Sequence, residues 1–293
     1  MMFSKLAKFI GFLVIFWGVI CLTVIAVSLG QLIPSAPFGN PSPLGIVTIE
    51  GELFDARPII SQIRTLREDA GVMGIVVRVE SPGGAVGAAQ EIMSELVSLR
   101  EDSFPVVASY GNIAASGGYY ATLPAERIFA NPGSLTGSIG VITQFMHGEK
   151  LLEKIGVAST AVTSGSMKDA GSPFRAPRPE DLAYFQNVVD DTYLQFTESV
   201  SIWRKIPMDS LKPFADGRVF TGRIAQKAGL VDSLGSLQDA VKWLSVRCGL
   251  DSVPSRLETS IPPKPFLEEL MQGVETALPA SLRNRARVLW MVP

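Results

Sequence analysis

The first 49 residues are nearly free of charge, and the apolar stretch within them is the clearest pattern in the chain. No Asp, Glu, Lys or Arg occurs from residue 9 to residue 49. Because a helix of about 20 apolar residues spans the hydrocarbon core of a bilayer, the pattern predicts a transmembrane anchor over residues 9–33. Lys5 and Lys8 precede it. By the positive-inside rule, residues 1–8 are then cytoplasmic and the rest of the chain lies outside the membrane.

A cleaved signal peptide is the alternative interpretation of this stretch, since Ala26-Val27-Ser28 resembles a small-residue cleavage site. The apolar run is longer than the usual core of a signal peptide, about 7–15 residues. This length favours an uncleaved anchor. Residues 34–44 contain several prolines and are predicted to form a stiff, extended linker.

From residue 45 onward, short apolar runs alternate with segments of helical periodicity. The alternation is typical of an α/β domain, which is expected over residues 45–250. Strands are predicted at 46–49, 74–79, 105–109, 127–130 and 157–163, and helices at 57–68, 86–100, 116–123, 179–205 and 236–249. The helix at 179–205 has an apolar face spaced three or four apart, made of Leu182, Phe185, Val189, Tyr193, Phe196, Val200 and Trp203.

The tail, residues 251–293, has no clear pattern, and its role stays open. It ends with a basic cluster, Arg283, Arg285 and Arg287. This cluster is either a solvated surface or a docking site for a neighbouring subunit or anionic lipid.

The composition argues against several kinds of catalytic and binding site. The chain has one histidine, two cysteines and a net charge of −2. A single histidine argues against His-based metal sites and allows Ser-His catalysis only through His147. Two cysteines cannot build a disulfide framework, and the charge gives no reason to expect nucleic acid as a partner.

Two predicted strands end in small residues and lead into helices. The first runs through Gly83 and Gly84, and the second through Ser116 and Gly117. Glycines at a strand-to-helix turn leave backbone N–H groups open to a ligand, and such groups stabilise a developing oxyanion. Tight turns or close packing points are the alternative. Neither turn matches a phosphate-binding fingerprint.

Ser116 is the candidate nucleophile, although a serine at a helix start is more often an N-cap. A nucleophilic serine needs a base, and His147 lies in a surface-like segment. A lysine serves instead if burial lowers its pKa from about 10.4 toward about 7–8. Lys168, in a small-residue loop, is the best candidate; the plain alternative is an exposed lysine paired with Asp169.

Five motifs in order give the chain a resemblance to the signal peptide peptidase A family of membrane-anchored serine proteases. They cover most of residues 45–240 and are Glu80-Ser81-Pro82-Gly83-Gly84, Ala114-Ala115-Ser116-Gly117-Gly118-Tyr119-Tyr120, Gly133-Ser134-Leu135-Thr136-Gly137-Ser138-Ile139-Gly140-Val141, Ser164-Gly165-Ser166-Met167-Lys168 and Asp216-Gly217-Arg218-Val219-Phe220-Thr221-Gly222-Arg223. The resemblance implies a crotonase/Clp-protease-like α/β fold, a spiral of strands and helices, in the short, single-core form.

The same resemblance implies the roles of the site residues. Ser116 is the nucleophile, Lys168 the general base, and Ser138 a hydrogen-bond partner that orients the lysine amine. The oxyanion hole is formed by the Gly117 N–H and one from the Gly83-Gly84 turn. This Ser-Lys dyad chemistry needs no metal or organic cofactor. Apolar residues such as Tyr119, Tyr120 and Phe174 either line substrate pockets or pack in the core.

The family's biology is also carried over as an expectation. Protomers form a ring in which a neighbouring subunit can supply the lysine, and the substrates are remnant signal peptides and other apolar segments. The expected location is a bacterial cytoplasmic (inner) membrane. Two alternatives remain: a crotonase-type acyl-CoA enzyme, which predicts carboxylates beside the glycine turns, and a non-catalytic membrane scaffold of the same fold.

Overall fold

The computed structural model describes residues 42–255 and 257–259. The predicted anchor at 9–33 lies outside these residues, as do most of the linker and the tail from residue 260 onward. Among the described residues, no helix is both long and apolar enough to cross a membrane.

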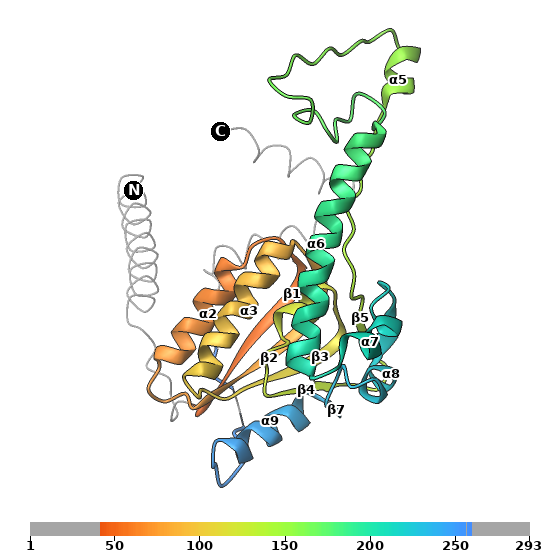
Figure 1. The fold of residues 1–293 in the computed structure, drawn as a ribbon. Coiled ribbons are helices and arrows are strands. Elements are labelled where there is room, and N and C mark those ends of the chain that lie inside the picture. The colour runs from red at the N-terminus through yellow and green to blue at the C-terminus, as the bar shows by residue number, and fades with distance from the viewer. Residues whose placement is uncertain (1–41, 256, 260–293) are drawn as a thin grey trace, which may run out of the picture. The chain divides into compact units, whose positions relative to one another are not determined.

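A parallel sheet forms the centre of the domain (Figure 1). Its order is β1-β2-β3-β4-β7, from β1 (Leu44–Leu53), β2 (Gly74–Gly84), β3 (Val106–Ala115), β4 (Arg127–Ala130) and β7 (Ser233–Leu234). The short β5 (Leu135–Gly137) continues the sheet beside the end of β3, and β6 (Val219–Thr221) pairs with it antiparallel. The α/β prediction is confirmed, and the parallel sheet is consistent with a crotonase/Clp-like fold.

Helices cover both faces of the sheet, and the alternation of side chains along the strands explains why. In β2, Ile75, Val77 and Val79 join the larger core under α2 (Arg57–Glu68) and α3 (Val86–Glu101). Val76 points to the opposite face and packs in the smaller core with α9 (Leu237–Arg247). A strand buried on both faces reads as a continuous apolar run, which is what the sequence shows.

The remaining helices belong to the C-terminal half of the domain, apart from α4 (Gly117–Ala121), which follows β3. The 26-residue α6 (Pro179–Arg204) begins with a proline in its first turn and ends at Lys205 in the left-handed conformation. Its C-terminal half packs on the core through Phe196 and Val200. Short elements complete the domain: α7 (Met208–Leu211), a 3-10 turn (Lys212–Phe214) and α8 (Gly222–Lys227).

The N-terminal half of α6 projects away from the sheet together with α5 (Glu149–Lys154) and the loop between them (Figure 1). We call residues 143–188 the arm. The prediction of a strand at 157–163 is wrong: this segment of the arm has no regular structure and is exposed. Its apolar residues have no strand beside them, and an unpaired strand is not stable in water.

Candidate active site

Ser116 occupies the turn between β3 and α4 in a strained backbone conformation. Its φ is 51° and its ψ is −122°, a region that costs a non-glycine residue about 1–3 kcal/mol. The surrounding structure imposes this conformation: the Ser116 N–H donates to the Gly137 carbonyl at 2.9 Å, and its carbonyl accepts from the Tyr120 N–H at 2.9 Å. Ser116 stands at the N-cap position of α4, but its side chain does not cap the helix.

The glycine turn at the end of β2 lies directly against Ser116. Gly83 has a φ of 109°, and a Cβ at this position would lie 2.7 Å from both the Gly117 nitrogen and the Ser116 Cβ. A Cβ on Gly117 would in turn lie 3.3 Å from the Gly84 nitrogen. The tight-turn interpretation of these glycines therefore applies, and the close approach brings the Gly84 and Gly117 amides beside the serine. That these amides face a ligand stays a prediction.

Ser138 faces the same hollow as Ser116. Both residues line a cleft with Val189, Tyr193 and Gly217. Ser138 also has a positive φ, 51°, and its N–H donates to the Arg218 carbonyl at 2.9 Å. The antiparallel pairing of β5 with β6 thus fixes Ser138 and joins two motifs that lie about 80 residues apart in the sequence.

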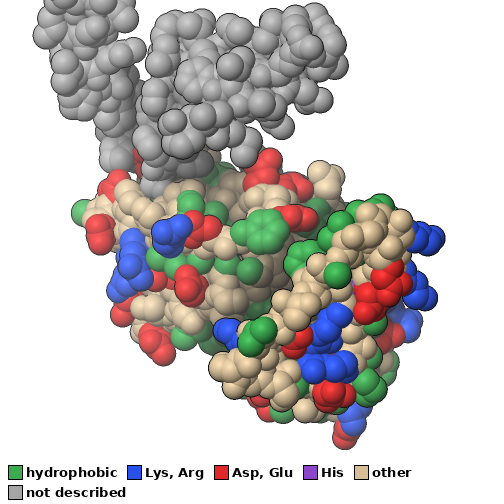
Figure 2. All heavy atoms as spheres, turned by 90° about the horizontal axis from the view of Figure 1, so that it is seen from above, with side chains coloured by type: hydrophobic (Ala, Val, Ile, Leu, Met, Phe, Trp, Pro, Cys, Tyr) green, Lys and Arg blue, Asp and Glu red, His purple; other side chains and the backbone are tan. Residues whose placement is uncertain are grey.

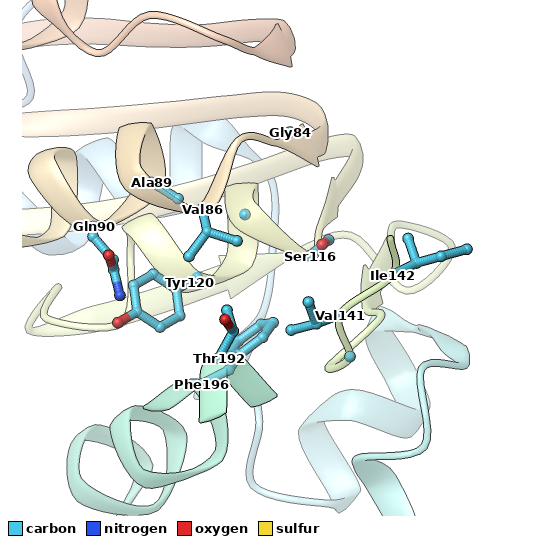
Figure 3. A pocket seen from close by; sticks show the side chains of 12 residues that line it. Gly84, Val86, Ala89, Gln90, Ser116, Tyr120, Val141, Ile142, Thr192 and Phe196 are labelled. Carbon is cyan, nitrogen blue, oxygen red and sulfur yellow. The ribbon is translucent and has the colours of Figure 1, made fainter. Parts of the chain in front are cut away.

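An apolar pocket opens beside the Ser116 hydroxyl (Figure 3). Val86 and Val141 point into it, and the rings of Tyr120 and Phe196 meet edge to face at 5.0 Å along its wall. Of the aromatic residues considered from the sequence, only Tyr120 lines this pocket. Tyr119 is fully buried and donates to the Leu230 carbonyl. Phe174 lies on the arm and is exposed.

No motif or periodicity in the sequence pointed to four further residues of this pocket, which come from α3, α6 and the loop after Ser138: Ala89, Gln90, Ile142 and Thr192. Phe196 was visible only as one position on the apolar face of α6. A helix face becomes a pocket wall through tertiary packing, so periodicity alone does not reveal it.

Within residues 42–255 and 257–259, no carboxylate lines the apolar pocket itself. The nearest acidic residue in the motif, Glu80, is engaged by Arg78 at 2.7 Å and by the Asn112 N–H. Asp216, in the cleft with Ser138, is paired with Arg218, and this hydrogen bond lowers the pKa of its carboxyl. Asp190 also lines this cleft and accepts a hydrogen bond from the Gln186 amide at 2.7 Å. The acyl-CoA alternative expects free carboxylates at the glycine turns, and Glu80, the acidic residue of that motif, is paired, which speaks against it.

Lys168 lies on the arm, away from Ser116. Its loop is tied to the first turn of α6 through the Arg178 guanidinium and the Ser166 carbonyl. The pocket touches the same helix at Thr192 and Phe196. Since an α-helix rises 1.5 Å per residue, Asp181 in the first turn and Thr192 are about 16 Å apart along the axis. The folded chain therefore does not bring its own Lys168 to its own Ser116.

The Lys168 side chain is exposed and, within the described part of the chain, makes no hydrogen bond or ion pair. The alternative of a Lys168–Asp169 pair is wrong, because Asp169 binds Arg175 instead. His147 is also exposed on the arm, two residues after Phe145, whose ring packs against Phe185 at 4.4 Å. The only imidazole of the chain does not line either hollow that contains Ser116.

No group of three or more His, Cys, Asp or Glu side chains in residues 42–255 and 257–259 is arranged to hold a metal ion. Cys248 is a free thiol, half-buried against the Met73 carbonyl. Burial raises the pKa of this thiol, which disfavours the reactive thiolate form.

Comparison with known proteins agrees with this geometry. Residues 98–251 match peptidase family S49. A putative protease of Synechocystis is 42% identical over 217 residues, covering 74% of this chain and 78% of the relative. A putative signal peptide peptidase SppA of Enterococcus faecium is 35% identical over 193 residues, covering 66% and 56%.

A longer relative, Protease 4 of Salmonella typhi, is 42% identical over 181 residues, which cover 62% of this chain but only 29% of that protein. The matches to the Synechocystis and Enterococcus proteins run through the same domain that contains the glycine turns and Ser116. The chain therefore belongs to peptidase family S49, the signal peptide peptidase A and protease IV family of serine proteases.

Proposed function

We propose that this protein is a membrane-anchored serine endopeptidase that degrades remnant signal peptides and other apolar peptide segments. The observation that carries the proposal is the setting of Ser116. Its hydroxyl has no hydrogen-bond partner among the described residues, stands beside the Gly84 and Gly117 amides and opens into an apolar pocket. A reactive hydroxyl, two backbone donors and a pocket for a side chain are the parts that acyl transfer requires.

The chemistry follows from these parts. A neutral lysine amine takes the Ser116 proton as the oxygen attacks the peptide carbonyl, and the Gly84 and Gly117 N–H groups stabilise the oxyanion. The peptide C–N bond breaks as the lysine returns the proton to the leaving amine. Water, deprotonated by the same amine, then hydrolyses the acyl-enzyme. Ser138, in the same cleft as Ser116, hydrogen-bonds the amine and orients it.

The base is Lys168 of a neighbouring copy. Lys168 is exposed on the projecting arm, whereas none of the described residues that line the pocket at Ser116 is basic. An arm that reaches into the next subunit in a head-to-tail contact generates a ring when the rotation closes. Each site is then completed by its neighbour, and a monomer is inactive.

Apolar residues on the arm support such a contact. Figure 2 shows hydrophobic side chains at the hollow between the arm and the rest of the domain. Exposed apolar side chains that gather on one surface are candidates for an interface. The arm residues that are more than half exposed are Met146, Leu151, Ile155, Val162, Phe174 and Leu182.

The substrate class follows from the pocket. Val86, Val141 and Phe196 give it apolar walls, so we expect cleavage next to apolar side chains. Replacing Val86 with Phe adds bulk that points into the pocket. We expect kcat/KM for peptides with a large apolar side chain at that subsite to fall about tenfold, with less effect for alanine.

Val246→Phe is the matched control, since Val246 is an exposed valine on α9, on the other face of the sheet. The measurement is kcat/KM on a peptide series that differs at one position. An equal loss for small and large side chains would contradict the assignment of the pocket to substrate.

The site acts at a membrane. Residues 9–33 are apolar and uncharged, and the positive-inside rule orients the protease domain outward, which in a bacterium is the outer side of the cytoplasmic membrane. Full-length protein should sediment with membranes and resist extraction at high salt, whereas a chain that begins at residue 34 should not. Release of the full-length protein by carbonate or salt would contradict the anchor.

A further inference from the structure

The arm has no apolar core of its own. Of residues 143–188, only Asp181 is buried, with 1% of its surface exposed. A single buried carboxylate is costly unless it is paired and hydrogen-bonded. The contacts of Asp181 therefore decide how the arm keeps its shape.

Asp181 is held by two arginines from the loop before α6. The Arg178 guanidinium donates to it at 2.8 Å, and Arg175 donates to its other oxygen. The Arg178 N–H adds a bond at 3.0 Å, as in a helix capping box. The hydrogen bonds of Arg178, followed by those of Arg175, hold the pKa of the Asp181 carboxyl well below its usual range. The cluster thus stays ionised at neutral and mildly acidic pH.

The same two arginines reach both sides of Lys168. Arg178 donates to the Ser166 carbonyl at 2.6 Å. Arg175 grips Asp169 with two bonds to its carboxylate, at 2.7 and 3.0 Å, and a third to its carbonyl at 3.1 Å. The backbone is therefore fixed two residues before Lys168 and one residue after it.

The cluster also leaves the lysine without a counter-ion. Asp169 is the carboxylate next to Lys168 in the sequence, and Arg175 occupies both of its oxygens. A lysine that is paired with a carboxylate is held in its protonated form and cannot act as a base. The arginines take up the carboxylates of Asp169 and Asp181, and Arg178 also pairs with Glu180 at 3.5 Å. The Lys168 amine has no ion pair among the described residues and so remains available to another chain.

We propose that Arg175, Arg178, Asp169 and Asp181 form a clasp that positions Lys168 for the Ser116 site of a neighbouring subunit. The inference rests on the proposed dyad shared between subunits. These four are positioning residues, since they act through Lys168. The clasp fixes the backbone beside Lys168, as the β5–β6 pairing fixes Ser138. In the arm this is done by charged side chains, because the arm has no apolar core.

The test introduces Arg175→Gln into one of two complementary chains at a time. Ser116→Ala chains donate the lysine, and Lys168→Ala chains donate the serine; co-expressed, they recover activity if the dyad is shared. Arg175→Gln on the lysine donor should lower the recovered kcat about tenfold to a hundredfold, because a misplaced base loses the reactive geometry. On the serine donor, the same substitution should leave kcat unchanged. KM should not change, whichever donor carries the substitution.

The comparison separates an effect on the lysine donor's own arm from a defect of assembly, because a defect of assembly affects both arrangements equally. Equal losses, or none in either, would overturn the clasp. If the starting mixture recovers no activity, the shared dyad itself is wrong and the inference falls with it. Arg57→Gln is the control: this arginine makes a similar bidentate contact with Asp55, on the exposed surface at the start of α2, and should have no effect on either donor.

A second variant guards against misfolding of Arg175→Gln. Asp169→Asn keeps Asp181 with both arginines, so the first turn of α6 is retained and only the link to the loop is weakened. We expect the same asymmetry between donors with a smaller loss. Gel filtration and thermal unfolding of each mixture should match those of the parent mixture.

Discussion

Replacing Ser116 with Ala should abolish peptide hydrolysis, with kcat falling about a thousandfold or more. The expectation rests on the Ser116 hydroxyl, which makes no structural hydrogen bond and does not cap α4. Its loss should therefore leave the fold intact. Hydrolysis of an apolar peptide, labelling by a serine-reactive inhibitor with mass mapping, and circular dichroism together measure the effect. Labelling should map to Ser116 in the wild type and disappear in the variant.

A matched control is Ser103→Ala. Ser103 also has a positive φ, 59°, but lies in the turn after α3 and does not line the pockets that contain Ser116. It should retain wild-type activity. Wild-type hydrolysis by the Ser116→Ala protein would refute the serine protease assignment of this residue.

Lys168→Arg should be as inactive as Lys168→Ala, because a guanidinium keeps its proton and cannot serve as a base. The substitution preserves the positive charge, so a loss of activity separates base catalysis from simple electrostatics. Lys154→Arg, on the short α5 of the same arm, is the control and should be active. An active Lys168→Arg protein would show that Lys168 is not the base.

Co-expression of Ser116→Ala and Lys168→Ala chains should restore activity that neither has alone. In a closed head-to-tail ring of equal, randomly placed chains, about a quarter of the contacts join an intact serine to an intact lysine. We therefore expect about a quarter of the wild-type kcat per chain. Titrating the ratio of the two chains should give a maximum near equal amounts.

The physical reason is the position of Lys168 on the arm: its loop is tied to the first turn of α6, and that turn lies about 16 Å along the helix axis from Thr192, where α6 reaches the Ser116 pocket. Dilution that dissociates the assembly should remove the restored activity, and it should also inactivate the wild type. Failure to restore activity, with assemblies of normal size and normal folding, would contradict the shared dyad and point to a movement of the arm toward its own Ser116.

The pattern of apolar residues predicted most of the helices and strands that pack in or on the sheet. The predicted helix at 179–205 corresponds to α6, Pro179–Arg204, and the predicted helix at 57–68 to α2. Strands were predicted too short, because β2 and β3 continue into the small residues that precede Gly84 and Ser116. Hydrogen bonds to neighbouring strands keep these extra residues in the sheet, and a pattern of hydrophobic residues does not reveal such bonds.

In the arm, the pattern of apolar residues predicts the structure less well. The stretch at 157–163 has the composition of a strand but no strand beside it, and the apolar face of α6 is exposed at Leu182. Both predictions assumed a core that the arm does not have. Its buried residue is Asp181, a charged side chain that the pattern of apolar residues does not single out.

The sequence by itself determined the residue types of the chemistry: a serine between small residues, paired glycines, a lysine in a small-residue loop and a single histidine. Such features are local, since turns and strand ends depend on a few successive residues. Only the tertiary structure decided that Gly83 contacts Gly117, that Ser138 shares a cleft with Ser116, and that Lys168 stands on an arm remote from both. Those relations depend on contacts between distant parts of the chain, which no local pattern encodes.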